Sequence, residues 1–415
     1  MKKHLSLMLR ILFAAAGVGY IAFTLTWSDS IVVPAGVALP NGVTPAKPMP
    51  FKVVEGDIID KEGKLVVRLD EKTTMEVDRA KLGAEVTDYR AKPGVPTTLA
   101  HAKVPLLLLG LLIVGPIYFV QSYRWWLLMK ARGLDCTLWK SFRLTMIGSF
   151  FNYCMPGTTG GDLVKAYYSA RNSDRRADSV MTVVVDRVTG LLGLVVMAGV
   201  AGLFMIAATN SGWLELSEKQ TKVVNSITGF IWLGMGVGAV CTAIYFSSRV
   251  RKKLGITPER IGKLPGAKLL LKIDEAALAY RHHIGVMFAA VALSLPVHLA
   301  LSGATAMAGY ALGIESPLGL LLTVVPVLFL AAAVPLTYQG LGVMEGLAMA
   351  LILSTTASEN QIVGMLLMIR FYQIFYSLLG SLFLLRGDIH MHPEREAEEP
   401  AAAEVAPISA NAAAA

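Results

Sequence analysis

The sequence predicts an all-α polytopic membrane protein, and its composition is the main reason. Hydrophobic residues make up 54% of the 415 residues and charged residues only 16%, whereas a globular protein has about 25% charged residues. The mean hydropathy is +0.56. A chain this apolar cannot cover its surface in water, so most of it must face lipid, where helices satisfy the backbone internally. Cytosolic enzymes and nucleic-acid-binding proteins are therefore excluded as leading interpretations.

The apolar windows set the number of expected spans, because a hydrocarbon core of about 30 Å takes about 20 helical residues. Six windows are long enough: 9–27, 104–128, 179–208, 225–247, 285–312 and 361–385. Two shorter apolar stretches, 317–334 and 341–356, flank a run of helix-breaking residues, and a third, 142–156, ends in Pro156 and Gly157. We expect six full spans plus two re-entrant helical hairpins, with about eight spans as the alternative.

Lys and Arg in the short loops indicate the orientation, because basic loops stay in the cytoplasm. The N-terminus and the segment after the second window are basic, and residues 248–284 contain nine Lys/Arg against three acids. Residues 162–178 are basic as well, so stretch 142–156 must return to the side from which it enters. We expect both termini in the cytoplasm of a bacterial-type plasma membrane. The first window is also compatible with a cleaved signal peptide.

Four segments follow from these windows. Residues 1–27 are expected to form an N-terminal transmembrane helix, 28–102 a small β-rich extracytoplasmic insert, 103–386 the main transmembrane domain, and 387–415 a disordered cytoplasmic tail. Within the insert, alternating residues at 53–60 and 65–69 flank a turn, which is typical of two paired strands. The insert contains no catalytic constellation.

Polar groups at membrane depth cost about 2.5–3.5 kcal/mol each on insertion scales, so those present indicate a function or a partner. The first cluster comprises Asn152, Pro156, Gly157, Gly160, Gly161, Asp162 and Lys165. Pro156 ends the incoming helix, and a new helix is expected to start near Asp162, where free N–H groups favour an anion. In the purely structural alternative, Asp162 is the N-cap and pairs with Lys165 one turn later.

A second cluster, Asp186 and Arg187, lies near the cytoplasmic start of the third window. Adjacent residues on a helix point in different directions, so at least one of the two must reach another helix. The alternative is a structural ion-pair network, or an Arg187 side chain that extends to the membrane interface.

A third cluster lies in the breaker-rich run and in the last window: Pro335, Gly340, Gly342, Glu345 and Arg370. The spacing Pro-x-Thr-x-x-Gly-x-x-Val begins at Pro156 and again at Pro335, which is compatible with an inverted repeat around a midplane site. Arg370 has no local partner, and an ion pair with Glu345 is its structural interpretation. The three cysteines form no disulfide framework, and we find no metal-ligand spacing or nucleotide-binding loop, so no metal and no cofactor are expected.

These motifs together, from Asn152 to Lys165, at Asp186-Arg187, and from Pro335 to Glu345 with Arg370, resemble the lysylphosphatidylglycerol synthase transmembrane region, a flippase-like family. The resemblance covers about residues 104–386. This chain departs from the family pattern at Lys165, where the family usually has Arg, and at the run after Pro335. Full synthases have a C-terminal aminoacyl-transferase domain, whereas here only the short tail follows, so the resemblance does not imply lipid aminoacylation.

The favoured hypothesis is a lipid translocator for a phospholipid or polyprenyl-phosphate headgroup, not an enzyme. A bare charge in hydrocarbon costs on the order of tens of kcal/mol, and Lys165, Arg187 and Arg370 would contact the phosphate instead of water. Loops 156–161 and 335–342 would form the gate, and the acidic side chains would organise the cations. An enzyme acting on a lipid phosphate, and a non-catalytic membrane partner of a lipid synthase or glycosyltransferase, are the alternatives. Membrane lipid is the expected partner, nucleic acid is not, and the sequence leaves the oligomeric state open.

Overall fold

The computed structural model describes residues 25–56, 58–59, 63–78, 90–154, 160–171, 173, 175–216, 218–246, 280–334, 337–353 and 357–385, together with Gly19. The expected tail and nearly all of the first apolar window lie outside the described residues. So do Pro156, Gly157 and Pro335 of the expected gate.

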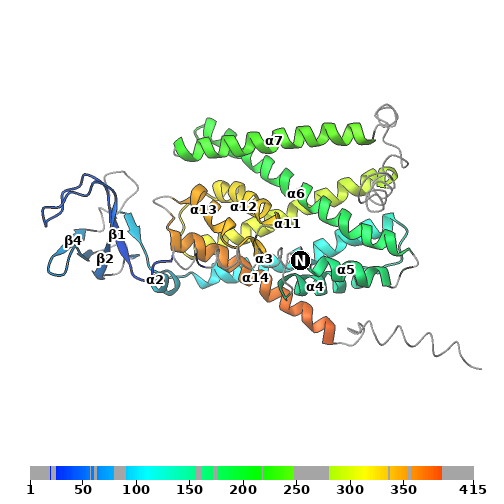
Figure 1. Ribbon diagram of the computed structural model, residues 1–415, viewed down its shortest axis with the longest axis horizontal. Helices are drawn as coiled ribbons and strands as arrows, with labels where there is room; N and C mark the ends of the chain where they lie inside the picture. Colours follow the sequence, from blue (N-terminus) through cyan, green and yellow to red (C-terminus); the bar gives the residue numbers. More distant parts are fainter. Residues whose placement is uncertain are drawn as a thin grey trace, which may run out of the picture.

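A five-stranded antiparallel sheet forms one end of the molecule, in the order β4-β3-β2-β1-β5 (Figure 1). Its strands are β1 (Ser30–Val33), β2 (Met49–Glu55), β3 (Lys64–Arg68), β4 (Thr74–Asp78) and β5 (Arg90–Lys92). The register places Val53 opposite Val67, so the alternating apolar residues share one face and bury a small core. The strand pair expected from the sequence corresponds to β2 and β3, and three further strands complete the sheet.

Five helices within the described residues are long and apolar enough to cross a membrane. They are α3 (Val104–Ala131), α6 (Arg176–Asn210), α7 (Glu218–Phe246), α11 (Ile284–Ala311) and α14 (Glu359–Leu385). These helices correspond to five of the six windows. A short helix, α2 (Val95–Ala100), joins the sheet to α3, and the N–H of Lys103 donates to the carbonyl of Ala311 at 2.8 Å, so α3 and α11 run antiparallel.

Two pairs of shorter helices lie between the long ones. The first pair is α4 (Leu138–Cys154) and α5 (Gly160–Arg171); the second is α12 (Leu318–Ala333) and α13 (Val343–Ile352), joined by the 3-10 turn η3 (Tyr338–Gly340). A second 3-10 turn, η2 (Arg281–His283), precedes α11. Figure 1 shows α12 and α13 in the half of the bundle nearer the sheet, and α4 and α5 in the other half.

Each short pair brings the chain back to the side from which it left. After α4 and α5, the guanidinium of Arg175 donates to the carbonyl of Arg132 at 2.8 Å, so α6 begins where α3 ended. After α12 and α13, α14 begins where α11 ended, because a Cβ added to Gly364 would lie 2.8 Å from the side chain of Leu312. Two full spans and a re-entrant hairpin both return the chain in this way, so the number of spans stays a prediction.

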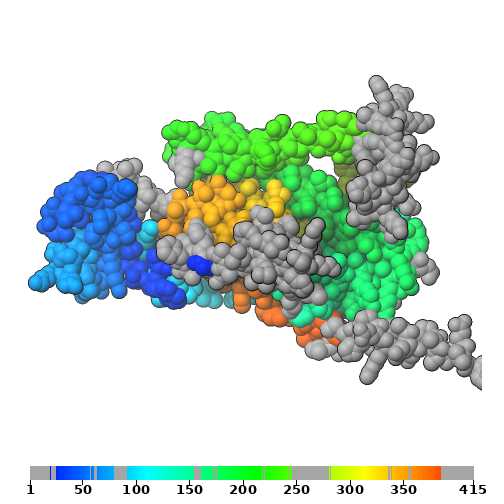
Figure 2. Space-filling view, viewed as in Figure 1, coloured from blue at the N-terminus to red at the C-terminus, as the bar shows by residue number. Residues whose placement is uncertain are grey.

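Helix α7 lies along one edge of the molecule (Figure 2) and packs on α6. The indole N–H of Trp232 donates to the carbonyl of Gly199 at 3.1 Å. Most of the second half of α7 is exposed, including Val237 and Val240, which is the expected surface of a helix solvated by lipid.

Candidate functional site

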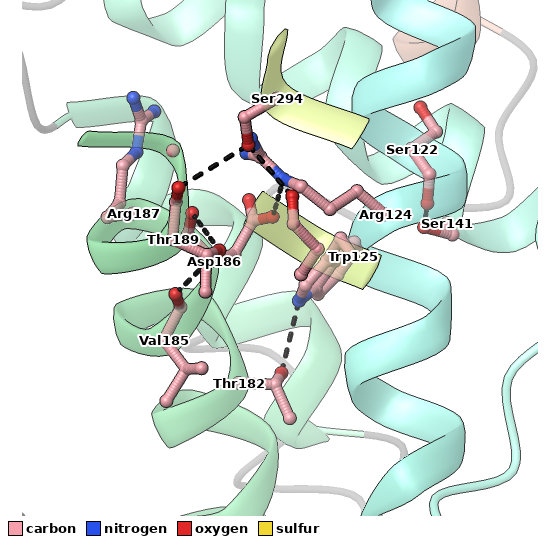
Figure 3. Close-up of polar contacts among 12 residues, drawn as sticks. Ser122, Arg124, Trp125, Ser141, Thr182, Val185, Asp186, Arg187, Thr189 and Ser294 are labelled. Carbon is pink, nitrogen blue, oxygen red and sulfur yellow. Dashed lines mark hydrogen bonds and ion pairs between the residues drawn. The ribbon is translucent and has the colours of Figure 1, made fainter. Parts of the chain in front are cut away.

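Three charged side chains from different helices meet inside the bundle: Arg124 of α3, Lys165 of α5 and Asp186 of α6, which we call the Asp186 cluster. One carboxylate oxygen of Asp186 accepts from Nε of Arg124 at 2.9 Å, and the other accepts from Nζ of Lys165 at 3.2 Å. The three residues are only 5–6% exposed. Asp186 therefore does reach other helices, and it reaches two of them. Figure 3 shows its contact with Arg124.

Neighbouring side chains hold the two cations in place. A guanidinium nitrogen of Arg124 donates to the hydroxyl of Ser294 on α11 at 2.6 Å. The same guanidinium lies against Gly190, where an added Cβ would meet two of its nitrogens at 3.3 Å, so only glycine fits there without a shift. The ammonium of Lys165 lies 3.9 Å from the ring centroid of Trp125, a favourable cation–π position.

The Asp186 cluster contains two cations and one carboxylate, so it has one excess positive charge when all three groups are ionised. A buried charge without a counter-charge is expensive. The hydroxyl of Ser294 and the indole ring of Trp125 offset part of that cost, but neither is an anion. The electrostatics of the cluster therefore favour the approach of one further negative charge.

Asp162 and Arg187 form a separate ion pair beside this cluster. The side chain of Arg187 is 53% exposed and that of Asp162 is 17% exposed. Helix α5 begins at Gly160, so Asp162 lies within its first turn, where an acidic side chain complements the helix dipole. The N-cap interpretation of Asp162, and its pairing with Lys165, are wrong: Lys165 turns to Asp186, which is more deeply buried.

A second buried ion pair joins helices α13 and α14 near the C-terminal end of the bundle sequence. Glu345, in the first turn of α13, has no exposed surface and pairs with Arg370 of α14. Its second carboxylate oxygen accepts from the backbone N–H of Gly342 at 2.8 Å. The ion pair expected as the structural interpretation of Arg370 is confirmed. Among the described residues, no ion pair joins this balanced pair to the Asp186 cluster.

Asn152 ties the two short helix pairs together. Its side-chain oxygen accepts from the N–H of Gly161 at 2.8 Å, and its own carbonyl accepts from the amide of Gln339 in η3 at 3.0 Å. The next residue, Tyr153, donates its hydroxyl to the side chain of Gln373 at 2.7 Å. Gln373 lies near the middle of α14, so the tip of the α4–α5 pair lies about halfway along a long helix.

Glycine is required at two kinds of position in these tips. A Cβ on Gly161 would lie 1.7 Å from the carbonyl oxygen of Gly148, so α4 and α5 touch backbone to backbone. Gly340 and Gly342 have φ of 70° and 81°, a left-handed conformation that glycine adopts without strain. Gln339 also has a positive φ, 53°, which is uncommon for a residue with a side chain.

The two copies of the Pro-x-Thr-x-x-Gly-x-x-Val spacing do not occupy equivalent positions relative to the helix that follows each of them. Gly161 is the second residue of α5, whereas Gly340 lies three residues before α13 begins. The proline ends of both motifs lie outside the described residues. The inverted repeat therefore stays a prediction.

Sequence reasoning missed three residues that complete these contacts: Arg124, Ser294 and Gln339. Arg124 lies inside the second apolar window with no acid near it in sequence, the same signal that singled out Arg370, but the motif analysis did not include it. Ser294 gave no signal, because a serine in an apolar helix is common. The described residues contain no group of three or more His, Cys, Asp or Glu side chains that could hold a metal ion.

These features define a multi-pass membrane protein with charged side chains buried among its helices. The chain belongs to the family described as the lysylphosphatidylglycerol synthase TM region, whose model matches residues 93–380. The resemblance seen in the sequence motifs is thereby confirmed. No curated protein matches the chain at a significant level.

Proposed function

We propose that this protein moves the headgroup of a phosphate-bearing lipid across a bacterial-type plasma membrane, with both chain termini in the cytoplasm. The observation on which this rests is the excess positive charge of the Asp186 cluster, buried among helices α3, α5, α6 and α11. A lipid phosphate brings the one negative charge that this cluster lacks. The acyl chains stay in the surrounding lipid while the headgroup passes along the protein.

The two short helix pairs support the same proposal. We infer that both are re-entrant, because their helices have only 10 to 17 residues, fewer than the about 20 that a span takes, and the tip of the first pair lies halfway along α14. Backbone breaks at that depth are tolerated only where they are buried in protein or line a cavity. The hydrogen bond from Gln339 to Asn152 joins the two tips, which makes this contact the natural gate between the two halves of the path.

Arg187 is the proposed entry residue of the path. Its guanidinium is half exposed, so it reaches a headgroup without rearrangement of the core, and Asp162 keeps it in place. Lys165 and Arg124 then receive the phosphate at greater depth. Arg370, which is buried and paired with Glu345, would contact the phosphate later on the path, on the side of the bundle that includes α13.

The test is reconstitution of the purified protein into vesicles that contain fluorophore-labelled lipids, one headgroup at a time. Dithionite, which does not cross the bilayer, bleaches only the label in the outer leaflet. We expect the wild type to expose the inner-leaflet label of at least one phosphate-bearing lipid. Arg187→Gln should abolish this transport and leave a monodisperse, folded protein, because the side chain is largely outside the core.

The matched control is Arg68→Gln on the exposed face of β3, which removes the same charge far from the bundle and should leave transport unchanged. Transport retained in Arg187→Gln would contradict the assignment of that residue. Chemical conversion of a labelled lipid by the purified protein would favour the enzyme alternative instead.

A further inference from the structure

His298 lies halfway along α11, and its two ring nitrogens are in different situations. Nε2 lies 3.0 Å from the carbonyl oxygen of Gly190 on α6. A carbonyl only accepts, so Nε2 must bear the proton, and Nδ1 of the neutral ring has a free lone pair. Nδ1 is buried and has no hydrogen-bond partner. The ring is therefore held ready to accept a proton at one defined atom.

This atom belongs to the immediate surroundings of the Asp186 cluster. Gly190 receives the Nε2–H of His298 on its carbonyl, and the guanidinium of Arg124 packs against its Cα. Ser294, one turn before His298 on the same face of α11, accepts from Arg124. A proton on His298 thus adds a second positive charge next to Arg124, in a region with little water to screen it.

Other charged groups on the neighbouring helices do not cancel that charge. Helices α3, α6 and α14, which pack against α11, contribute these charged or titratable groups near the middle of the bundle: Tyr118, Arg124, Asp186, Arg187, Arg370, Tyr372 and Tyr376. The three tyrosines are uncharged at neutral pH. Arg187 is neutralised by Asp162 and Arg370 by Glu345. Helix α12 contains no titratable side chain. The carboxylate of Asp186 is already shared between two cations.

We propose that His298 is a proton-binding site whose occupancy is linked to the anion bound by the Asp186 cluster. The proposal rests on the proposed function, because it takes a lipid phosphate as that anion. The proton adds to the Nδ1 lone pair and comes from the aqueous phase; no other bond changes. A bound phosphate offsets the excess charge beside Arg124 and so favours the protonated ring, and by linkage a protonated ring favours the phosphate.

A polar stripe on α11 connects this atom with the sheet side of the bundle. Ser294, His298 and Ser302 follow one another at intervals of four residues, so they share one helix face. The hydroxyl of Ser302 is buried and has no hydrogen-bond partner. A headgroup that leaves the cluster would therefore release the proton again, and these polar groups mark the face of α11 on which that proton is held.

The first measurement is the affinity of the purified protein for short-chain phosphatidylglycerol between pH 6 and 8.5. The phosphodiester does not titrate in this range, so a pH dependence must come from the protein. The protonated fraction of a histidine falls about tenfold per pH unit above its midpoint, so we expect the wild-type affinity to fall by up to about tenfold per unit. His298→Gln keeps an N–H donor for Gly190 and should bind with an affinity that does not change with pH. His283→Gln, an exposed histidine at the start of α11, is the control and should behave like the wild type.

The second measurement uses only the wild type, so it does not depend on whether a variant folds. Addition of phosphatidylglycerol to weakly buffered protein should take up protons, reported by a pH indicator dye. Binding or transport that is independent of pH, without proton uptake, would overturn the link to His298 and leave the proposed function intact. If neither phosphatidylglycerol nor any other phosphate-bearing lipid is bound or moved at any pH, both proposals are wrong.

Discussion

Removal of the Asp186 charge gives a sharp test of the buried cluster. Asp186→Asn keeps the shape of the side chain but leaves Arg124 and Lys165 buried with no counter-charge, and raises the excess from one positive charge to two. Deleting one partner of a buried ion pair costs about 3–5 kcal/mol. Because Asp186 neutralises two cations at 2.9 and 3.2 Å, we expect the upper part of that range.

Lys165→Met is the matched substitution, because it removes the excess cation and leaves the Arg124–Asp186 pair balanced. Its cost is the cation–π contact with Trp125, about 0.5–2 kcal/mol. Loss of the buried excess charge offsets this cost, and the methionine fills most of the space. Lys165→Met should therefore be about as stable as the wild type, and Asp186→Asn clearly less stable than both.

The assay is thermal unfolding of the detergent-purified variants, followed by tryptophan fluorescence. With roughly 2–4 °C per kcal/mol, Asp186→Asn should melt about 10 °C or more below the wild type and Lys165→Met within a few degrees of it. The double variant should recover part of the loss, because it returns the cluster to one excess charge. Equal losses for the two single variants would refute the charge count on which the proposed site depends.

Three further outcomes follow from the packing and electrostatics. Gly161→Ala should destabilise the protein by about 1–3 kcal/mol, because the added Cβ meets the α4 backbone. Its control, Gly346→Ala, lies at a helical position with open space and should be neutral or stabilising by up to about 1 kcal/mol. The unfolding temperatures of the two variants are compared, and equal losses would contradict the close contact. Glu345→Gln should destabilise by about 3–5 kcal/mol, and the added Arg370→Met should restore part of this in the same assay; no recovery would show that charge is not the cause. Burial raises the pKa of the Cys136 thiol. In a variant that keeps only this cysteine, maleimide labelling at neutral pH should therefore be slower than that of free cysteine, and it should accelerate as the pH rises. A labelling rate equal to that of free cysteine would contradict the burial of this thiol.

The long helices were predictable because their signal is compositional. Twenty or more apolar residues without charge leave few alternatives to a spanning helix, and five of the expected windows correspond to helices in the structure. The short helices were predictable from their length and from the helix-breaking residues between them, and for the first pair also from the basic residues that flank it on both sides. The sheet was predicted less completely, since β1 and β5 are short and pair across long gaps in sequence, which local alternation does not reveal.

The site was predicted by residue type more than by partner. Asp162, Lys165, Asp186, Arg187, Glu345 and Arg370 all take part in buried or half-buried ion pairs, because charges in apolar segments must find partners. Which partner each finds depends on helix packing. The contacts that distinguish Lys165–Asp186 from Lys165–Asp162 depend on how α5 lies against α6, and no spacing in the chain specifies that.

The hydrogen bond between Asn152 and Gln339 joins residues that are 187 positions apart, and this has a consequence for biogenesis. While the ribosome still translates the middle of the chain, Asn152 lacks its partner Gln339 and Arg124 lacks its partner Ser294. The early helices are thus held in a provisional arrangement until the C-terminal third arrives. Maturation of the polar interior is a late, post-insertion event, and a nascent chain arrested before Gln339 would expose it to quality-control proteases.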